Sequence, residues 1–290
     1  MKPIIKYQGG KTRELPIIKK LAPTEFNRII EPFAGGAAVS FAYEKPAILC
    51  DINDAVLNLY MMVRQPGMYH EIFSHVNWLK TLDHDELEKR YYMARDNLND
   101  QWGVDAYTYA IAYITVRQLC FSGMERYNKQ GDFNVPFGHY KKFSCNLDWN
   151  HMKYLQECQI CRGFHEGFDR ADYDDWIFID PPYRDRLGYT QGDGGGDLHD
   201  ELVDRMIHTQ SKWLFIHTEC DYYKEKLKDY NIIIKPFGYG QRFGKNKNHA
   251  NASVSHMYVT NYDTDMTLHY VAQPSLLDIC NNSTEGLTAA

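Results

Sequence analysis

A carboxylate, two prolines and an aromatic ring follow one another at Asp180, Pro181, Pro182 and Tyr183. A carboxylate can accept hydrogen bonds and stabilise developing positive charge, and a tyrosine ring can stack on a flat ligand. The preceding residues 176–179 are β-branched or aromatic, which is typical of a buried strand that proline cannot continue. Because ligands bind at the carboxyl ends of strands in open α/β sheets, these four residues are the candidate catalytic group.

Tyr7 and Lys11 flank paired glycines near the N-terminus. The sequence of Gly10, Lys11 and a threonine is also part of a phosphate-binding loop, but that loop requires an earlier glycine where Ile5 stands. It also requires a preceding strand, for which there is no room. The glycines still allow a ligand to approach the backbone, and Tyr7 offers a ring for stacking. The alternative is an ordinary turn before a helix at residues 14–21.

Residues 29–39 have the pattern of a strand, a glycine turn and the start of a helix. Small residues at 34–36 would allow close approach of a ligand, as in the first βα unit of a nucleotide-binding sheet. The next predicted strand, residues 47–50, ends at Asp51, where an acid can bind ribose hydroxyls. An acid after a strand is also often a helix cap, a role open to Asp54. Together the two signals favour a ligand that contains a nucleoside.

Residues 122–142 combine a turn with basic and aromatic side chains. Residues 128–131 have turn chemistry between two extended arms, whose basic residues include Arg126 and Lys141. A β-ribbon fits the major groove of DNA, where arginine can pair with guanine and lysines can meet phosphates. Composition alone leaves open whether this segment binds DNA or is a surface hairpin with solubilising charges.

The composition narrows the class of protein. The 290 residues are 44% hydrophobic, enough for a core, yet contain no apolar run of about 18 residues that could span a membrane. The N-terminus lacks the apolar segment of a signal peptide, and an odd number of cysteines, seven, indicates reduced thiols and a cytoplasmic location. Cys158 and Cys161 have zinc-like spacing without a second pair, so we expect buried thiols and no metal site. With a formal charge of −6, any DNA-binding surface must be locally basic.

Helical periodicity dominates between residues 57 and 118, between the early strands and those predicted later in the chain. The later strands are expected at residues 212–217, 231–234 and 255–262. The chain is therefore expected to be an α/β protein with a discontinuous catalytic domain, an inserted domain and a tail. These are residues 1–58 with 145–262, residues 59–144, and the polar residues 263–290.

Four separated segments resemble, in the family's order, the Dam-like D12 class of DNA adenine-N6 methyltransferases. They are residues 7–11, residues 31–36, Asp51, and the motif Asp180-Pro181-Pro182-Tyr183. This last motif also resembles that of enzymes that methylate glutamine or RNA. More specifically, residues 126–128 followed by 131–138 resemble the recognition hairpin of members that methylate GATC. The resemblance covers about residues 6–262.

The resemblance implies a Rossmann-like methyltransferase sheet with an inserted helical and β-hairpin target-recognition domain. It also implies that S-adenosyl-L-methionine lies across the strand ends, with its ribose held by Asp51 and its adenine beside Phe168. The residues that would bind this cofactor are Tyr7, Lys11, Phe33, Ala34, Gly35, Gly36, Asp51, Ile52, Phe168 and Asp180.

The implied reaction is transfer of a methyl group to N6 of adenine in double-stranded DNA. The lone pair of N6 is delocalised into the ring, so the amine is a poor nucleophile. Asp180 and the Pro181 carbonyl can each accept one N–H bond, which draws the nitrogen toward a tetrahedral shape. The base must leave the duplex to be reached, and Tyr183 would stack on it. No covalent intermediate is required.

The resemblance also assigns contacts with DNA, and Arg126 is expected to bind the guanine before the target adenine. His139 stands where a close relative carries arginine, so a phosphate contact there would differ. The glycine-rich residues 188–197 also depart from the family, and we expect them to form a loop that orders on substrate. The DNA-binding candidates are Met124, Arg126, Asn128, Pro136, His139, Tyr140, Lys141, Arg242 and Lys245.

Two alternatives stay open at this point. The chain could methylate adenine in RNA, or it could be a catalytically silent DNA-binding module of the same fold. The intact Asp180 and Tyr183 count against the second alternative. In the tail, residues Gln273 to Leu277 resemble a short motif that docks on the replication sliding clamp. We expect a monomer or a weak dimer.

Overall fold

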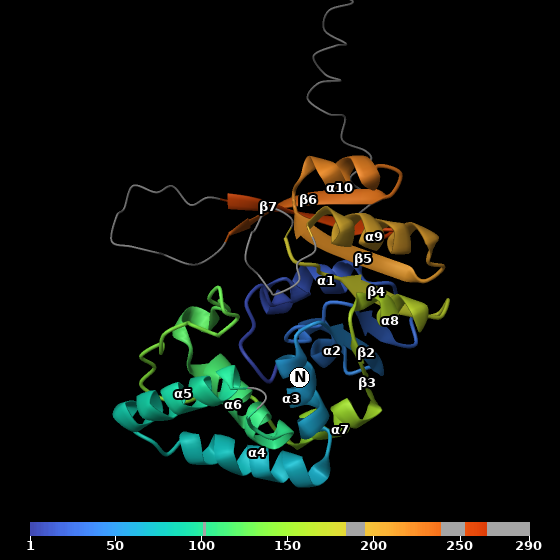
Figure 1. Ribbon diagram of the computed structural model, residues 1–290. Helices are drawn as coiled ribbons and strands as arrows, with labels where there is room; N and C mark the ends of the chain where they lie inside the picture. The colour runs from blue at the N-terminus through green and yellow to red at the C-terminus, as the bar shows by residue number, and fades with distance from the viewer. Residues whose placement is uncertain (101–102, 184–194, 239–252, 266–290) are drawn as a thin grey trace, which may run out of the picture.

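The computed structural model describes residues 1–100, 103–183, 195–238 and 253–265, and the other residues lie outside the described part of the chain (Figure 1). Its centre is a sheet of seven strands in the order β3-β2-β1-β4-β5-β7-β6. β7 runs antiparallel to β5 and β6, and the other neighbours pair in parallel. The strands are β1 (Ile29–Glu31), β2 (Ala47–Asp51), β3 (Gln159–Arg162), β4 (Trp176–Ile179), β5 (Lys212–Thr218), β6 (Asn231–Gly238) and β7 (Ser253–Thr260).

The strand order reverses between β1 and β4, which are neighbours although β2 and β3 lie between them in the sequence. Ile29 pairs with Trp176 and Ile30 with Ile177, in parallel, so both strands end at one edge of the sheet. In open α/β sheets this reversal point is where ligands bind. The glycine turn after β1 and Asp180 after β4 are therefore at the edge that the sequence predicts.

Strand β4 is apolar throughout because both faces of the sheet are covered. Trp176 and Phe178 belong to one apolar cluster, which also contains buried residues of α1 (Leu15–Leu21), α2 (Ala38–Tyr43) and α3 (Asp54–Val63). Ile177 and Ile179 belong to a second cluster, with residues of α8 (Phe164–Asp169), α9 (Gly195–His208) and α10 (Asp221–Lys226). The described chain is thus a sheet between two helical layers, a Rossmann-like architecture.

Two boundaries differ from the sequence-based expectation. Asn53, not Asp54, caps α3: its side-chain oxygen accepts a bond from the Ala55 amide at 3.0 Å. An amide oxygen satisfies this donor as well as a carboxylate does. Residues 195–197, expected to belong to a glycine-rich loop, begin α9, and the preceding residues 188–194 lie outside the described residues.

A group of helices lies apart from the sheet, joined to it through α3 (Figure 1). It consists of α4 (Pro66–Leu79), α5 (His84–Asn99) and α6 (Ala106–Leu119). The amphipathic α5 buries Leu87 and Tyr91. α6 is buried nearly all round its C-terminal half, including Arg117. Division of the chain into domains at residues 58 and 145 stays a prediction.

The hairpin predicted at residues 122–142 is present, but as separate bridges and not as continuous strands. Cys120 pairs with Phe137 and Tyr127 with Phe133, both antiparallel. The 3-10 turn η2 (Phe121–Gly123) precedes the hairpin, and α7 (Trp149–Glu157) leads the chain back to β3. Among the described residues, no helix combines the length and hydrophobicity that a bilayer crossing requires.

Candidate active site

An ion pair lies at the carboxyl end of β4. The Nζ atom of Lys11 is 2.6 Å from Oδ2 of Asp180, and their side chains are only 4% and 19% exposed. Lys11 comes from the turn η1 (Lys11–Arg13) and also donates to the Gly9 carbonyl at 2.9 Å. Burial raises the pKa of the Asp180 carboxyl, and the Lys11 ammonium opposes that rise. Lys11 therefore positions the carboxylate and favours its charged form.

The ring of Tyr183 lies among aromatic and basic groups. Its centroid is 5.1 Å from that of His217, edge to face, and 5.7 Å from Nζ of Lys11. Its hydroxyl is 3.5 Å from Nε2 of His256, a long contact. Tyr183 is half-buried, so a part of its surface is open to a ligand.

A buried acid, Glu14, lies behind Tyr183 and was not among the functional residues predicted from the sequence. Glu14 Oε2 lies 2.9 Å from Nδ1 of His256 and accepts a bond from the Tyr258 hydroxyl at 2.6 Å. Burial acts to raise the pKa of Glu14, but the bonds from these partners and the charge of Lys11 outweigh it and lower the pKa. With its Nδ1 directed at Glu14, His256 has its Nε2 atom on the side of the Tyr183 hydroxyl. The N-terminal segment thus contacts Asp180 through Lys11 and holds the neighbour of Tyr183 through Glu14.

Asp51 ends β2 beside the glycine turn. Its carboxylate accepts the backbone N–H of Gly35 at 2.7 Å and that of Asn53 at 2.9 Å. Burial raises the pKa of Asp51 to about 6, although both N–H bonds favour the charged form. Each carboxylate oxygen has a further lone pair, so Asp51 can accept ligand hydroxyls while it holds the turn.

The glycine turn packs against the ring of Tyr7. Gly35 has a φ of +45°, and a Cβ atom there would lie 2.6 Å from the Tyr7 ring. Its carbonyl accepts a bond from the buried Tyr60 hydroxyl at 2.7 Å. At Gly36 a Cβ atom would be 3.0 Å from the Tyr7 side chain. Glycine is required here because the turn and the N-terminal ring occupy adjoining space.

An aromatic row lies beside the ends of β1 and β2. Phe33 stacks on Phe164 with centroids 5.5 Å apart, and Phe164 meets Phe168 edge to face at 6.4 Å. Ile52 next to Asp51 is 40% exposed, and Ala34 is buried. The predicted residues Phe33, Ile52 and Phe168 thus provide apolar groups at the strand ends, where Asp51 provides the acidic group. Phe164, the middle ring of the row, escaped the sequence argument because it resembles ordinary core.

Arg126, predicted to bind guanine, lies exposed on the hairpin. Its Nε donates to Oδ1 of Asn134 at 2.7 Å and its Nη2 to the Asn134 carbonyl at 3.1 Å. Asn128 uses its side chain in the turn: its Oδ1 accepts the amides of Gln130 and Asp132, both at 2.9 Å. Arg126 is thus held extended along the hairpin, and Asn128 shapes the turn.

The remaining predicted DNA contacts differ in exposure. Pro136, His139 and Lys141 are exposed, and Met124 and Tyr140 are half-buried. The Tyr140 hydroxyl donates to the Cys120 carbonyl at 3.3 Å, and its ring lies 3.9 Å from the Lys6 ammonium.

The predicted phosphate contacts Arg242 and Lys245 lie outside the described residues, as do Gln273 to Leu277.

A buried arginine joins the hairpin to the N-terminal segment. Arg117, fully buried, donates to the carbonyls of Lys6, Gly123 and Met124 at 2.8–3.1 Å. Its Nη1 is 3.7 Å from Oε2 of Glu125, which is also buried. The guanidinium donates four hydrogen bonds to three carbonyls, which its planar fork of N–H donors allows.

Glu125 extends this connection to the end of β2. Its Oε1 accepts bonds from the side chains of Asn53 at 2.8 Å and Tyr127 at 2.9 Å, and its amide donates to Gln8 at 2.7 Å. Asn53 follows Asp51 closely, and the charge of Glu125 contributes to the raised pKa of Asp51. The sequence contained no signal of this network, because its members come from four separated segments.

Comparison with known proteins agrees with this arrangement. The family model for D12 class N6 adenine-specific DNA methyltransferases matches residues 7–236. The type II methyltransferase M.CviBI of Paramecium bursaria Chlorella virus NC1A is 32% identical over 243 residues, which are 79% of this chain and 88% of that protein. Type II methyltransferase M.MjaIII of Methanocaldococcus jannaschii is 33% identical, covering 63% of this chain and 70% of that protein.

A DNA adenine methylase of Haemophilus influenzae is 31% identical over 63% of this chain and 64% of its own length. The matched residues 7–236 contain the N-terminal glycines, both acidic strand ends and the hairpin. The chain belongs to the D12 class N6 adenine-specific DNA methyltransferase family and is an adenine-specific DNA methyltransferase.

Proposed function

We propose that this enzyme transfers a methyl group from S-adenosyl-L-methionine to N6 of an adenine flipped out of duplex DNA, at GATC or a related GA-containing site. The observation that carries the proposal is the Lys11–Asp180 ion pair, held at the strand reversal point beside the half-buried Tyr183. A charged acceptor, a stacking ring and a nucleoside-binding edge are the groups this reaction needs.

The residues along the strand ends fit the cofactor. S-adenosyl-L-methionine, when bound, supplies a methyl group made electrophilic by its sulfonium. Asp51 offers a positioned acceptor for ribose hydroxyls, and the exposed Ile52 offers an apolar contact next to it. Phe33 and Phe168 lie in one aromatic row that suits an adenine ring. Beside Tyr7, the exposed Gly9 and Gly10 leave backbone close to the surface, where the methionine part would lie.

Asp180 and the Pro181 carbonyl would act on the target amine. Each accepts one N–H bond from N6, which draws the nitrogen from planar toward tetrahedral geometry and frees its lone pair for attack. As the new N–C bond forms, the bond between the methyl group and the sulfur of the cofactor would break, with its electron pair left on the sulfur. Positive charge would develop on N6, and one N6 proton would then pass to solvent. A carboxylate already fixed by Lys11 stabilises that charge without reorganising. Pro182 and Pro181 keep the two acceptors on a stiff turn.

Tyr183 would hold the target base by stacking. Its ring packs edge to face against His217 and its hydroxyl lies 3.5 Å from Nε2 of His256, contacts that would orient the ring for a flat ligand. Flipping is required because N6 cannot be reached inside a duplex.

The hairpin would read the sequence around the adenine. Arg126 contacts Asn134 in the absence of DNA, and guanine O6 and N7 offer a bidentate replacement for those bonds. The exposed Lys141, with Arg242 and Lys245, would meet phosphates. Met124, Pro136, His139 and Tyr140 lie along the same segment and would contact the site or fill the space of the flipped base. Asn128 would act through the turn, and residues 59–144 would form the recognition domain.

Several partner assignments belong to the same proposal. The enzyme would work as a monomer or weak dimer, because one chain carries both the cofactor edge and the hairpin. Residues Gln273 to Leu277 would dock on a sliding clamp, which loss of clamp pull-down on changing Leu276 and Leu277 to alanine would test.

The central test uses cofactor with a labelled methyl group and a panel of substrates. The panel holds a GATC duplex, duplexes changed at one base, a duplex already methylated at the target N6, and an RNA of the same sequence. We expect label in the GATC duplex or in one GA-containing relative, and none in the premethylated control. Transfer to RNA but not to duplex DNA would overturn the proposal, and equal labelling of all duplexes would overturn its sequence-specific part.

A further inference from the structure

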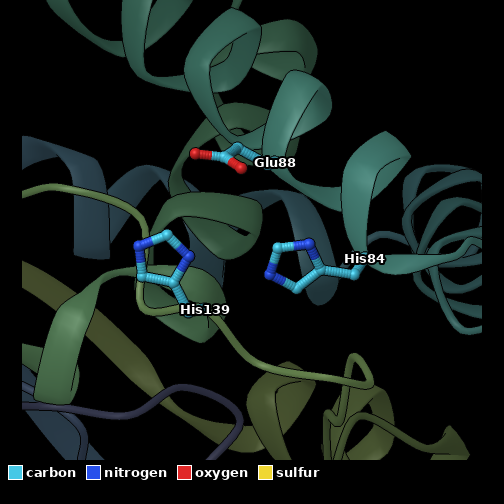
Figure 2. A group of neighbouring side chains, drawn as sticks. All are labelled: His84, Glu88 and His139. Atoms are coloured by element: carbon cyan, nitrogen blue, oxygen red, sulfur yellow. The ribbon is translucent and has the colours of Figure 1, made fainter.

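Three side chains capable of binding a metal ion lie together away from the catalytic edge. Within the described part of the chain, His84, Glu88 and His139 form the one group of this kind, with ligand atoms all within 4.8 Å of one another. Figure 2 shows the two imidazole rings and the carboxylate arranged around a shared space. His84 and Glu88 are half-buried and His139 is exposed, so an ion can enter from solvent.

The three residues come from two separate segments of the chain. His84 and Glu88 lie one turn apart on α5, and residues with this spacing share a helix face. His139 lies two residues after Phe137, the last bridged residue of the hairpin, and has a φ of +51°, a left-handed conformation that a residue with a Cβ atom rarely adopts. The amide of the preceding Gly138 donates to the Leu119 carbonyl at 2.7 Å, which helps to hold this turn.

The hairpin is fixed to the same helix on which two of the ligands lie. Tyr91 of α5 donates from its hydroxyl to the Val135 carbonyl at 2.7 Å. Asn99 accepts the Phe133 amide at 2.7 Å and donates to its carbonyl at 3.2 Å. Phe137, two residues before His139, is 1% exposed and packs its ring 5.6 Å from that of Tyr91. Packing of the hairpin against α5 therefore fixes the distance between His139 and this helix.

The ligand atoms lie close enough to reach the separations of a tetrahedral site. The rings of His84 and His139 are nearly parallel, 13° apart, with centroids separated by 5.8 Å. Zinc binds imidazole nitrogen at about 2.0–2.1 Å, so tetrahedral ligand atoms lie about 3.3 Å apart. From separations within 4.8 Å, each ligand atom must move inward by on the order of 1 Å, which rotation of half-exposed side chains allows.

The surroundings favour a cation. Nδ1 of His84 is 3.1 Å from Oδ1 of Asp85, an arrangement that leaves Nε2 to bind the ion and makes the ring a better donor. The N-terminal end of α5 carries a partial positive charge, but Asp83 and Asp85 add full negative charges there, whereas Glu86 is paired with Lys89 and Arg90. The ring of Phe137 lies 5.5 Å from both imidazoles and forms an apolar wall beside the group.

We propose that His84, Glu88 and His139 bind a divalent transition-metal ion such as zinc. Two imidazoles and one carboxylate are the ligands that such an ion of intermediate softness takes, and a fourth position stays open for water. The ion cross-links the segment that follows the hairpin to α5 and changes the net charge of the group, with neutral imidazoles, from negative to positive. This site lies outside the chemistry of methyl transfer and does not rest on the function proposed above.

The test measures metal binding directly on the full chain, purified without an added histidine tag and freed of metal with a chelator. Zinc is titrated in competition with a chromophoric chelator. We expect one site of micromolar affinity or better in the wild-type protein. His84→Ala, Glu88→Gln and His139→Asn should each weaken it about tenfold or more. Asparagine is chosen at 139 because it tolerates the left-handed backbone.

His208→Ala is the matched control, since His208 is also a helical histidine near a carboxylate, 71% exposed, and lies outside the group. Cobalt supplies a second measurement: visible absorption typical of four-coordinate cobalt should appear in the wild type and the control and be lost in the three variants. Near-UV circular dichroism checks that each variant is folded. Absence of zinc binding in the wild type, or equal binding by all variants, would overturn the proposal, the latter by assigning the ion to cysteine thiols.

Discussion

The catalytic edge and the hairpin are held by opposite means. Lys11, Glu14 and His256 are each no more than 4% exposed. Lys11 pairs with Asp180 at 2.6 Å, and Glu14 holds His256 at 2.9 Å beside the Tyr183 hydroxyl. On the hairpin, Arg126 and Lys141 carry their charges in solvent. Buried charges interact strongly and have few alternative partners, whereas exposed charges are screened and exchange partners readily. One region is thus built to keep a single geometry, and the other to exchange its own bonds for bonds to a ligand.

The two regions are nevertheless connected through buried groups. Arg117 binds the backbone of both the N-terminal segment and the hairpin, and Glu125 reaches Asn53 beside the cofactor edge. A shift of the hairpin must therefore disturb bonds near Asp51. Substitutions at each of these places test whether the two regions differ in this way and whether they are coupled.

Asp180→Asn should have the largest effect. The amide keeps the shape of the side chain but loses the charge that stabilises the reacting nitrogen, so kcat should fall by ~10²–10³-fold. DNA affinity should change little, because Asp180 lies largely buried at the end of β4 and is not one of the exposed charges of the hairpin. Single-turnover methylation and fluorescence anisotropy measure the two quantities. Asp174→Asn, an exposed acid near the start of β4, is the control. Substantial turnover by Asp180→Asn would contradict the proposed chemistry.

Lys11→Met should weaken both catalysis and folding. Asp180 would stay largely buried without its cation, so the free energy of unfolding should fall by about 1–3 kcal/mol. Loss of the ammonium raises the pKa of Asp180 further, and protonation disables the acceptor, so the acid limb of the kcat profile should move to higher pH. Urea denaturation and a pH–rate profile check both effects, with the exposed Lys20→Met as control. An unmoved acid limb would show that Lys11 does not govern Asp180.

Arg126→Ala should reduce discrimination and leave the chemistry intact. A bidentate pair with guanine is worth ~1–3 kcal/mol, so the preference for the correct base should fall by about 10–100-fold at a single position. Lys141→Ala is the contrasting variant: it should weaken binding to all sequences equally and reduce the slope of log K against log salt by about 0.9. Equal losses on all sequences for Arg126→Ala would make it a phosphate contact.

Cofactor affinity should depend on pH through Asp51. The pKa of this carboxyl is raised to about 6, so the free protein is protonated below that pH and loses an acceptor for ribose hydroxyls. Affinity should fall by at most about tenfold per pH unit below 6. A raised carboxyl pKa also means that the folded state binds the proton more tightly than the unfolded state, so protonation of Asp51 itself stabilises the fold. Calorimetry between about pH 5 and 8 measures the affinity, with Asp51→Asn expected to show no such slope.

Glu125→Gln sharpens this last prediction and should have the smallest effect. It removes a negative charge that helps to raise the pKa of Asp51, so the fall in cofactor affinity should begin at a lower pH. The glutamine oxygen can still accept from Asn53 and Tyr127, which limits the structural damage. An unchanged titration would show that the hairpin and the cofactor edge are electrostatically independent.

The sequence alone determined the features that depend on local order. Apolar runs that end in Asp51 and Asp180 predicted both strands and the side of the sheet on which each acid lies, because strands, glycine turns and prolines have short-range causes. The turn at residues 128–131 was likewise predictable, since Asn128 bonds to its own neighbours.

Only the tertiary structure decided which side chains meet. Lys11 pairs with Asp180, Glu14 binds His256, and Arg117 donates to the Lys6 carbonyl, although long stretches of chain separate the partners. His139 likewise meets His84 and Glu88 because Phe137 packs on α5. No local pattern encodes such pairs, since they form when packing of the apolar core brings distant segments together and their polar groups must then find partners.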